Sequence, residues 1–223
     1  MSPRLARRLW RHHLPLFALS GGGAFVLYVT RSYSDVVMRL SFSTAWPALV
    51  LLTLTLLIGP WRTLKGRTST ISLDLRRDTG VWAGTLGLLH TGIGQCVHLR
   101  GRPWLYYVYE KWNAHVVPLR HDIFGFSNFA GLFAALIVLA ALATSNDASL
   151  RALGNAQWKS LQRWNYAGFA LAAFHTFGYL VGIESLKPAF IITAILCVIV
   201  AAALQWAGWR SRIMPQTVRN GTK

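Results

Sequence analysis

The sequence predicts an all-α fold: a polytopic membrane protein built as a bundle of about six transmembrane helices. Apolar residues make up 53% of the 223 residues and charged residues only 13%, a composition typical of integral membrane proteins. Six apolar windows are long enough to cross about 30 Å of hydrocarbon at about 1.5 Å per residue. The basic residues fall mainly between these windows. Together, these three observations argue against a soluble domain.

The expected spans follow one another closely along the chain. In order, they are residues 14–30, 40–58, 80–98, 122–144, 164–183 and 188–208. The first follows a basic stretch, as in a signal peptide, but no A-x-A-like cleavage site comes after it, so we expect an uncleaved helix. Pro188 suits the first turn of the last helix. We treat residues 1–223 as one transmembrane domain with basic tails at 1–13 and 209–223.

The connection between the fourth and fifth spans is expected to be structured. Residues 147–163 place leucines among polar residues, with Asp147 and Ser149 as candidate caps. This pattern predicts a short helix lying on the inner membrane surface.

The connection between the third and fourth spans is rich in aromatic residues, which suits the headgroup region. Three roles are open for the aromatic residues Trp104, Tyr106, Tyr107 and Trp112. They could cover the outer exit of the bundle, contact an acceptor protein, or form an ordinary aromatic belt at the membrane interface.

The charge distribution predicts the orientation of the chain. Its 23 Lys and Arg residues against 7 Asp and Glu give a net charge of +16, which in a soluble domain would suggest nucleic acid. Here 16 basic residues fall on one side of the expected spans and 7 on the other. Topology and anionic lipid headgroups explain this bias, and it places both termini in the cytoplasm of a bacterial-type inner membrane. No nucleic-acid partner is expected.

Two histidines lie deep in apolar spans, where ionisable groups are costly and usually serve a site. His90 is ten residues from Gly80, about 15 Å along a helix, and His175 is eleven residues from Trp164, about 16 Å. Both helices run from inside to outside, so the two histidines are expected at one level near the middle of the bilayer.

Small residues accompany both histidines at helical spacing. They are Gly84, Gly87 and Gly94 around His90, and Gly168, Ala172, Gly178 and Gly182 around His175. Each set leaves a shallow trough in which a flat macrocycle would fit. The alternative is that the small residues only allow close helix packing, with the histidines hydrogen-bonding across the seam.

Haem held by two histidines is the ligand set that the pattern favours. No carboxylate or cysteine accompanies the pair, as zinc or non-haem iron would require. Imidazoles in both axial positions favour electron transfer over the binding of oxygen or substrate.

Two sequence runs resemble a known family. The run RRDTGVWAGTLGLLH, Arg76 to His90, and the run LGNAQWKSLQRWNYAGFALAAFH, Leu153 to His175, are similar to signatures of ferric-reductase-like transmembrane domains. The nearest members are the MsrQ-like haem-binding membrane subunits of bacterial methionine sulfoxide reductase systems. The two runs span about half the chain, and the family core is expected at about residues 44–208.

The resemblance implies a six-helix membrane cytochrome b with His90 and His175 as axial ligands. It also implies that electrons come from a flavoprotein or quinol and pass across the membrane to an acceptor oxidoreductase. The second signature usually carries another histidine thirteen residues before the last, and here that position is Gln162. One haem b is therefore expected, and a second stays open, with His98 as its candidate ligand.

Three arginines near the inner side are candidates for anchoring the haem propionates or an anionic cofactor: Arg76, Arg77 and Arg163. Positive-inside topology accounts for them equally well. The spans and loops leave no room for a flavin or nicotinamide domain, so the electron donor is expected to be another molecule.

Two other functions remain open. One is a small transporter or structural membrane protein without a cofactor. The other is a direct ferric or metal reductase acting at the outer face, which differs from the electron relay only in its acceptor.

Overall fold

The computed structural model describes residues 3–66, 73–99, 101–184 and 187–213. Apart from one isolated β-bridge between Val108 and Leu119, the regular structure in these ranges is helical. The elements are α1 (Pro3–Arg8), the π-helix η1 (Leu9–His13), α2 (Leu14–Thr30), α3 (Val36–Lys65), α4 (Leu73–Gly94), the 3₁₀-helices η3 (Pro103–Tyr106) and η4 (Trp112–Ala114), α5 (Ile123–Ala143), α6 (Asp147–Phe177), the π-helix η5 (Gly178–Ile183) and α7 (Pro188–Ile213).

The chain is an all-α polytopic membrane protein. In the part that the structure describes, five segments are long and apolar enough to cross a membrane: Leu5–Thr30, Val36–Lys65, Ile123–Ala143, Asp147–Ile183 and Pro188–Ile213. The expected span 80–98 falls mainly on α4, which is not among them. Charged residues in its first turns, including Asp74 and Asp78, and the glycines and His90 further along lower its hydropathy. α4 instead packs between α3 and α5.

The expected connection at 147–163 is helical, but it differs from the prediction in its extent and in its cap. A short helical segment begins at Asp147 and ends at Gly154, whose non-helical φ and ψ kink α6, and the residues after the kink belong to the long part of α6 that ends at Phe177. The cap is also different: the side chain of Asn146 accepts a hydrogen bond from the Ser149 N–H at 2.8 Å. The prediction for Pro188 is confirmed, since α7 begins there.

The kink in α6 depends on a glycine. Gly154 has φ 72° and ψ 165°, a conformation in which an L side chain is strained. We therefore expect Gly154→Ala to lower the free energy of unfolding by about 1–3 kcal/mol, measured as a lower thermal midpoint in detergent. Gly22→Ala is the matched control, because a Cβ there would meet nothing within 4 Å. Equal midpoints for the two variants would contradict the prediction.

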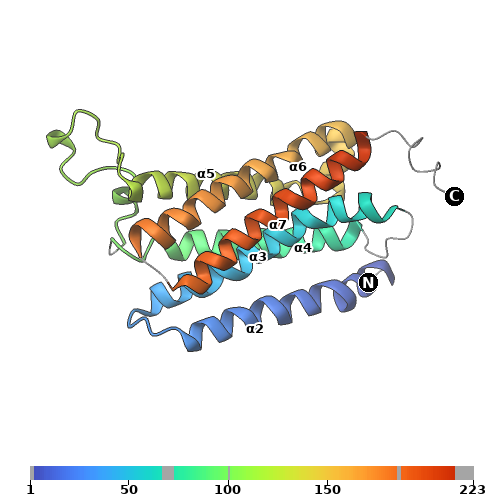
Figure 1. Ribbon diagram of the computed structural model, residues 1–223, viewed down its shortest axis with the longest axis horizontal. Coiled ribbons are helices and arrows are strands. Elements are labelled where there is room, and N and C mark those ends of the chain that lie inside the picture. Colours follow the sequence, from blue (N-terminus) through green and yellow to red (C-terminus); the bar gives the residue numbers. More distant parts are fainter. Residues whose placement is uncertain (1–2, 67–72, 100, 185–186, 214–223) are drawn as a thin grey trace.

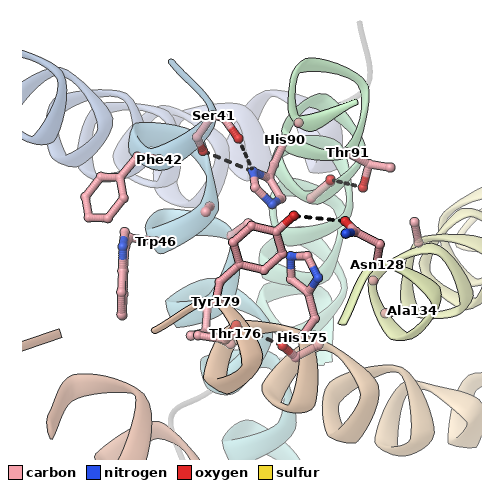
Figure 2. A pocket seen from close by; sticks show the side chains of 18 of the residues that line it. Ser41, Phe42, Trp46, His90, Thr91, Asn128, Ala134, His175, Thr176 and Tyr179 are labelled. Atoms are coloured by element: carbon pink, nitrogen blue, oxygen red, sulfur yellow. Dashed lines mark hydrogen bonds between the residues drawn. The ribbon is translucent and has the colours of Figure 1, made fainter. Parts of the chain in front are cut away.

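α4 and α6 lie on opposite sides of a pocket, and α3 and α5 complete its walls (Figure 2). α4 packs against α3 and α5, while α6 packs mainly against α5. α1 begins and α7 finishes at one end of the bundle, called the terminal end here (Figure 1). The segment that links α4 to α5 lies at the opposite end, called the loop end.

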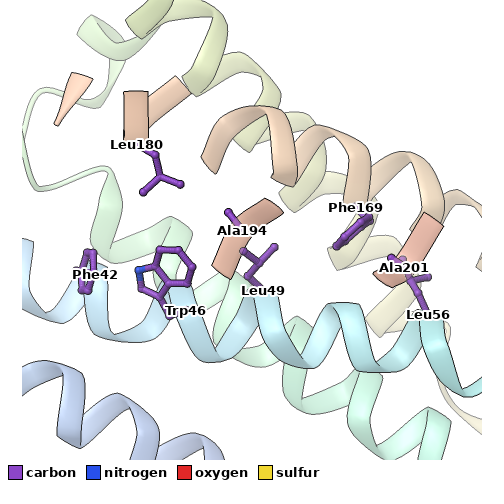
Figure 3. Packing of buried hydrophobic residues seen from close by; sticks show 8 residues of the cluster. All are labelled: Phe42, Trp46, Leu49, Leu56, Phe169, Leu180, Ala194 and Ala201. Atoms are coloured by element: carbon purple, nitrogen blue, oxygen red, sulfur yellow. The ribbon is translucent and has the colours of Figure 1, made fainter. Parts of the chain in front are cut away.

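The main apolar core joins α3 to α6, η5 and α7 (Figure 3). Leu56 and Leu180 are each only 2% exposed, and Phe42 and Trp46 meet the ring of Phe190 at 5.0 and 4.9 Å between ring centres. The buried members of this core are Phe42, Trp46, Leu49, Leu56, Phe169, Leu180, Ala194 and Ala201.

A buried carboxylate attaches the N-terminal helix to α4. The Asp78 side chain is 0% exposed and ion-pairs with Arg8. Its Oδ2 accepts from His12 Nδ1 at 2.7 Å, and its Oδ1 lies 3.3 Å from His13 Nε2. The π-helical turn η1 contains both histidines, so the irregular turn brings two neighbouring side chains to one carboxylate. A buried carboxylate without such partners would be costly.

Candidate functional site

Two histidine rings meet inside the pocket. His90 lies four residues before the end of α4, and His175 lies two residues before the end of α6, so both are near the loop end. Their ring centres are 6.1 Å apart, with 67° between the ring planes. Figure 2 shows the two side chains pointing toward each other from opposite helices. The two histidines were expected to lie at the same depth along the bundle, and the contact between their rings agrees with this expectation.

Each imidazole is held by a neighbouring helix through the same nitrogen. His90 Nδ1 lies 3.0 Å from the carbonyl oxygen of Ser41 on α3, and His175 Nδ1 lies 2.8 Å from the carbonyl oxygen of Ser127 on α5. A carbonyl oxygen only accepts, so these contacts assign the proton of each ring to Nδ1. The Ser41 Oγ also lies 3.3 Å from His90 Nδ1 and accepts from the same N–H in this tautomer. Each Nε2 then carries a lone pair, the form in which imidazole binds a metal.

The spacing of the two rings fits a single metal between them. Metal–imidazole bonds are about 2.0–2.1 Å long, so two imidazoles on opposite sides of one metal have ring centres about 6 Å apart. The observed 6.1 Å matches this geometry. The donor set, two neutral imidazoles with their outer nitrogens already hydrogen-bonded, fits the axial positions of a haem iron.

The pocket changes character along its length. Toward the terminal end its walls are apolar, formed by Ala48, Leu49, Leu52, Ala83, Ala134, Ala135 and Val138. Toward the loop end its walls carry polar groups, from Gln95, His98, Asn128, Tyr179 and Glu184. The two histidines stand between these parts.

Three of the predicted small residues line the pocket, namely Gly87, Gly94 and Ala172. A Cβ on Gly87 would meet nothing within 4 Å, so this part of α4 faces open space in the pocket. A Cβ on Gly94 would lie 3.6 Å from Ser41 Oγ and 4.0 Å from His90 Cε1. A flat ligand beside His90 would therefore meet only backbone at Gly87.

The other predicted glycines serve close packing against α5, as the alternative explanation proposed. A Cβ on Gly178 would lie 1.9 Å from Ser127 Oγ, and one on Gly168 would lie 3.1 Å from Ile137. Gly84 and Gly182 similarly pack on Val138 and Ile123. Gly178, the first residue of η5, thus allows this part of the chain to approach α5 closely. It does not form part of the expected trough for a flat ligand.

Gly131 on α5 was missed from the sequence. A Cβ there would lie 2.7 Å from His175 Nδ1 and 3.0 Å from its Cε1. The His175 ring therefore rests on the α5 backbone, next to the Ser127 carbonyl that it bonds. The one available signal was a glycine four residues after a serine within an apolar span, a common pattern at helix interfaces.

Tyr179 and Asn128 were also missed as pocket residues. The Tyr179 hydroxyl donates to Asn128 Oδ1 at 3.0 Å, and its ring lies 4.9 Å from the His175 ring. The π-helical turn η5 carries Tyr179, and irregular turns of this kind leave no clear mark in a sequence.

His98 and Gln162, the two positions considered for a second haem, lie in different parts of the structure. His98 lines the pocket at the loop end, and its ring contacts Tyr106, Phe124 and Tyr179 rather than another described histidine. Gln162 Nε2 donates to the carbonyl of Ala141 at 3.2 Å, on the side of α6 that packs against α5.

The candidate propionate anchors do not line the pocket among the described residues. Arg77 donates to the Ser145 carbonyl at 2.7 Å and to Asp147 at 2.6 Å, which ties α4 to the turn before α6. The side chain of Arg76 lies close to Gly59 on α3, and Arg163 is exposed.

The aromatic residues of the loop end behave differently from one another. Tyr106 is 1% exposed, and its hydroxyl donates to the Gly94 carbonyl at 2.9 Å. Tyr107 accepts from Gln95 Nε2 at 2.9 Å, whereas Trp104 is 58% exposed. The side chain of Trp112 lies outside the described residues. Tyr106 and Tyr107 therefore bond to Gly94 and Gln95, which line the pocket, and among the described side chains of this group Trp104 is the exposed one.

Comparison with known proteins relates the chain to a haem-binding membrane subunit. No model of a known protein family matches the chain. Over 175 residues the chain is 32% identical to the protein-methionine-sulfoxide reductase heme-binding subunit MsrQ of Bordetella pertussis, covering 76% of this chain and 74% of that protein. The wider resemblance to ferric-reductase-like transmembrane domains stays a prediction.

Proposed function

This chain belongs to the MsrQ family of membrane proteins, and from that premise we propose that it is a membrane cytochrome b that relays single electrons through one bis-histidine haem b to a partner oxidoreductase. The relative is named as the haem-binding subunit of a reductase system. His90 and His175 are the proposed axial ligands.

The paired histidines are the observation that supports this proposal most. The two rings lie 6.1 Å apart, and because each Nδ1 is engaged by a carbonyl, Nε2 is the nitrogen of each ring that could bind a metal between them. Haem bound there would supply one-electron chemistry at an iron whose two axial positions are filled. The protein's part is to hold both imidazoles in the metal-binding tautomer and to keep the surroundings apolar.

The donor and the acceptor are separate molecules in this proposal. The pocket and the six long helices account for most of the described residues, and the described residues include no strand–turn–helix unit of the kind that binds nucleotides. We propose a flavoprotein or a quinol as donor and an oxidoreductase as acceptor. The membrane is a bacterial-type inner membrane with both chain termini on the cytoplasmic side.

The visible spectrum of the detergent-purified protein tests the proposal. Reduction with dithionite should give a sharp Soret band and a low-spin α-band, as expected for two axial imidazoles. A colourless protein that takes up no added haem would contradict the proposal and favour a transporter or structural protein without cofactor. Rapid oxidation of the reduced protein by ferric ions alone, at the rate given by the partner oxidoreductase, would favour the direct metal reductase.

We also expect one haem per chain. Toward the terminal end the interior is filled: a Cβ on Gly84 would lie 3.4 Å from Val138, and one on Gly168 would lie 3.1 Å from Ile137. Gln162→His should therefore leave the haem content unchanged, because position 162 faces the Ala141 carbonyl rather than the pocket. Haem content per chain, measured as the pyridine haemochrome, checks this, and two haems in Gln162→His would contradict it.

A further inference from the structure

We propose that His98 receives the propionate edge of the haem at the loop end of the pocket and supplies the positive charge beside it, in place of Arg77 and Arg163. This inference rests on the proposed function, because it concerns how the same pocket orients its cofactor. His98 is a positioning residue here and not an iron ligand.

The polarity of the pocket sets the direction of the haem. One edge of haem carries two carboxylates, and the opposite edge carries only apolar substituents. Burying a carboxylate among apolar side chains without a partner is costly. The terminal-end walls offer only alanine, leucine and valine side chains, whereas Gln95, His98 and Asn128 lie toward the loop end. The carboxylate edge therefore points to the loop end.

His98 is the group that can balance that charge among the described residues that line the pocket. Among the described residues that line the pocket, the titratable side chains are His90, His98, His175, Tyr179 and Glu184. Two of these are the proposed ligands, and neither a tyrosine nor a glutamate supplies a positive charge. No lysine or arginine belongs to this lining within the described residues.

The surroundings of His98 leave its ring nitrogens available. Neither nitrogen makes a hydrogen bond to another described residue, and Nε2 lies 3.8 Å from Glu184 Oε1. The His98 backbone N–H donates to the Tyr106 hydroxyl at 2.8 Å, which fixes the position of the residue. The ring stacks on Tyr179 at 5.9 Å and meets Phe124 at 5.8 Å.

Glu184 is the only carboxylate found beside His98 in the described part of the chain, and it also accepts from the Tyr33 hydroxyl at 3.3 Å. Burial lowers the pKa of His98 below its usual value, while Glu184 acts in the opposite direction. A propionate would add a second negative charge next to the ring and favour the protonated form.

A protonated His98 near the haem favours the reduced state, because reduction removes one positive charge from the iron. As pH rises and His98 loses its proton, the reduced state loses this stabilisation, and the midpoint potential should fall. Conversely, each electron that arrives from the donor raises the affinity of His98 for a proton from water at the loop end.

Redox titration of the purified protein between about pH 5 and 8, the range in which histidine titrates, tests the proposal. We expect the midpoint potential of the native protein to fall as pH rises across this range. His98→Gln should keep its haem and its low-spin spectrum. The midpoint potential of this variant should no longer depend on pH. At the acidic end of the range it should lie about 59 mV below that of the native protein, which corresponds to an about tenfold shift in the ratio of reduced to oxidised haem toward the oxidised form.

Three further measurements separate a charge effect from a structural one. His98→Arg should restore the high potential without the pH dependence. Reconstitution with haem dimethyl ester, which lacks the carboxylates, should abolish the difference between the native protein and His98→Gln. His115→Gln, on the exposed part of the loop, should behave as the native protein.

Several outcomes would overturn the inference. One is an unchanged titration curve in His98→Gln, and another is a similar shift in Arg77→Gln or Arg163→Gln instead. Loss of the low-spin spectrum in both His98→Gln and His98→Arg would show His98 to be a ligand rather than a propionate partner. A native protein without haem would instead refute the proposed function, so the two failures are distinguishable.

Discussion

His90→Ala and His175→Ala should each reduce haem binding by at least about tenfold. Changing a residue that only orients a metal ligand typically costs about 10–100-fold in affinity, and removing a ligand should cost no less. The neighbouring imidazole cannot compensate, because its Nδ1 is bonded to a helix carbonyl and only its Nε2 reaches the iron. The measurements are haem content per chain and the low-spin α-band after reduction.

His115→Ala is the matched control, since His115 is an exposed histidine of the same chain. It should retain the haem content and the spectrum of the native protein. A native spectrum in either His90→Ala or His175→Ala would remove that residue from the ligand set. A spectrum lost in all three variants would indicate a general loss of folding.

Gly131→Ala should weaken haem binding although it adds only one methyl group and removes neither proposed ligand. The new Cβ would lie 2.7 Å from His175 Nδ1, so the ring must move. Moving the ring breaks the 2.8 Å hydrogen bond to the Ser127 carbonyl. Loss of such an orienting bond typically costs about 10–100-fold in metal affinity. Haem titration of the apoprotein measures the change.

The control for Gly131→Ala is again Gly22→Ala, where a Cβ meets nothing within 4 Å. Overpacking also costs about 1–3 kcal/mol of stability, so the thermal midpoint of each apoprotein should be measured beside its haem affinity. Unchanged haem affinity in Gly131→Ala would show that the His175 ring does not rest on α5 as described.

Much of the fold was predictable from the sequence because apolar length is a strong signal. The span expected at 14–30 coincides with α2, and the span expected at 122–144 differs from α5 by one residue at each end. The least accurate boundary was the start of α6, and the expected spans for α3 and α4 each differ from the helix by four residues at one end and seven at the other. The first turns of α4 and α6 are polar. In α4 these turns pair Asp78 with Arg8, so charges that appear unsuitable for a membrane helix are neutralised by a distant segment.

The sequence predicted that two histidines would lie close together, and the structure shows this pair in the pocket, but it did not predict the contacts that hold the two rings. His90 and His175 stand out because they are polar residues in apolar spans. The carbonyl groups of Ser41 and Ser127 carry no side-chain signature, and Gly131 resembles any packing glycine. Such contacts depend on which helices are neighbours in space, and hydrophobic periodicity does not determine that.

The role expected for Arg77, as an anchor for haem propionates, could not be decided from the sequence for a different reason. A basic residue near a membrane surface suits both topology and the binding of an anion, and its sequence environment does not separate the two. The structure shows Arg77 bonded to Ser145 and Asp147, which occupies it with the junction of α5 and α6.

The two carbonyl contacts would affect how fast the proposed haem exchanges an electron. The speed of such a step depends on how far the surrounding atoms must shift when the charge changes. Because α3 and α5 hold the two imidazoles through hydrogen bonds, these rings have little freedom to move. A haem bound between them would therefore have a low reorganisation energy, which would suit a rapid electron carrier.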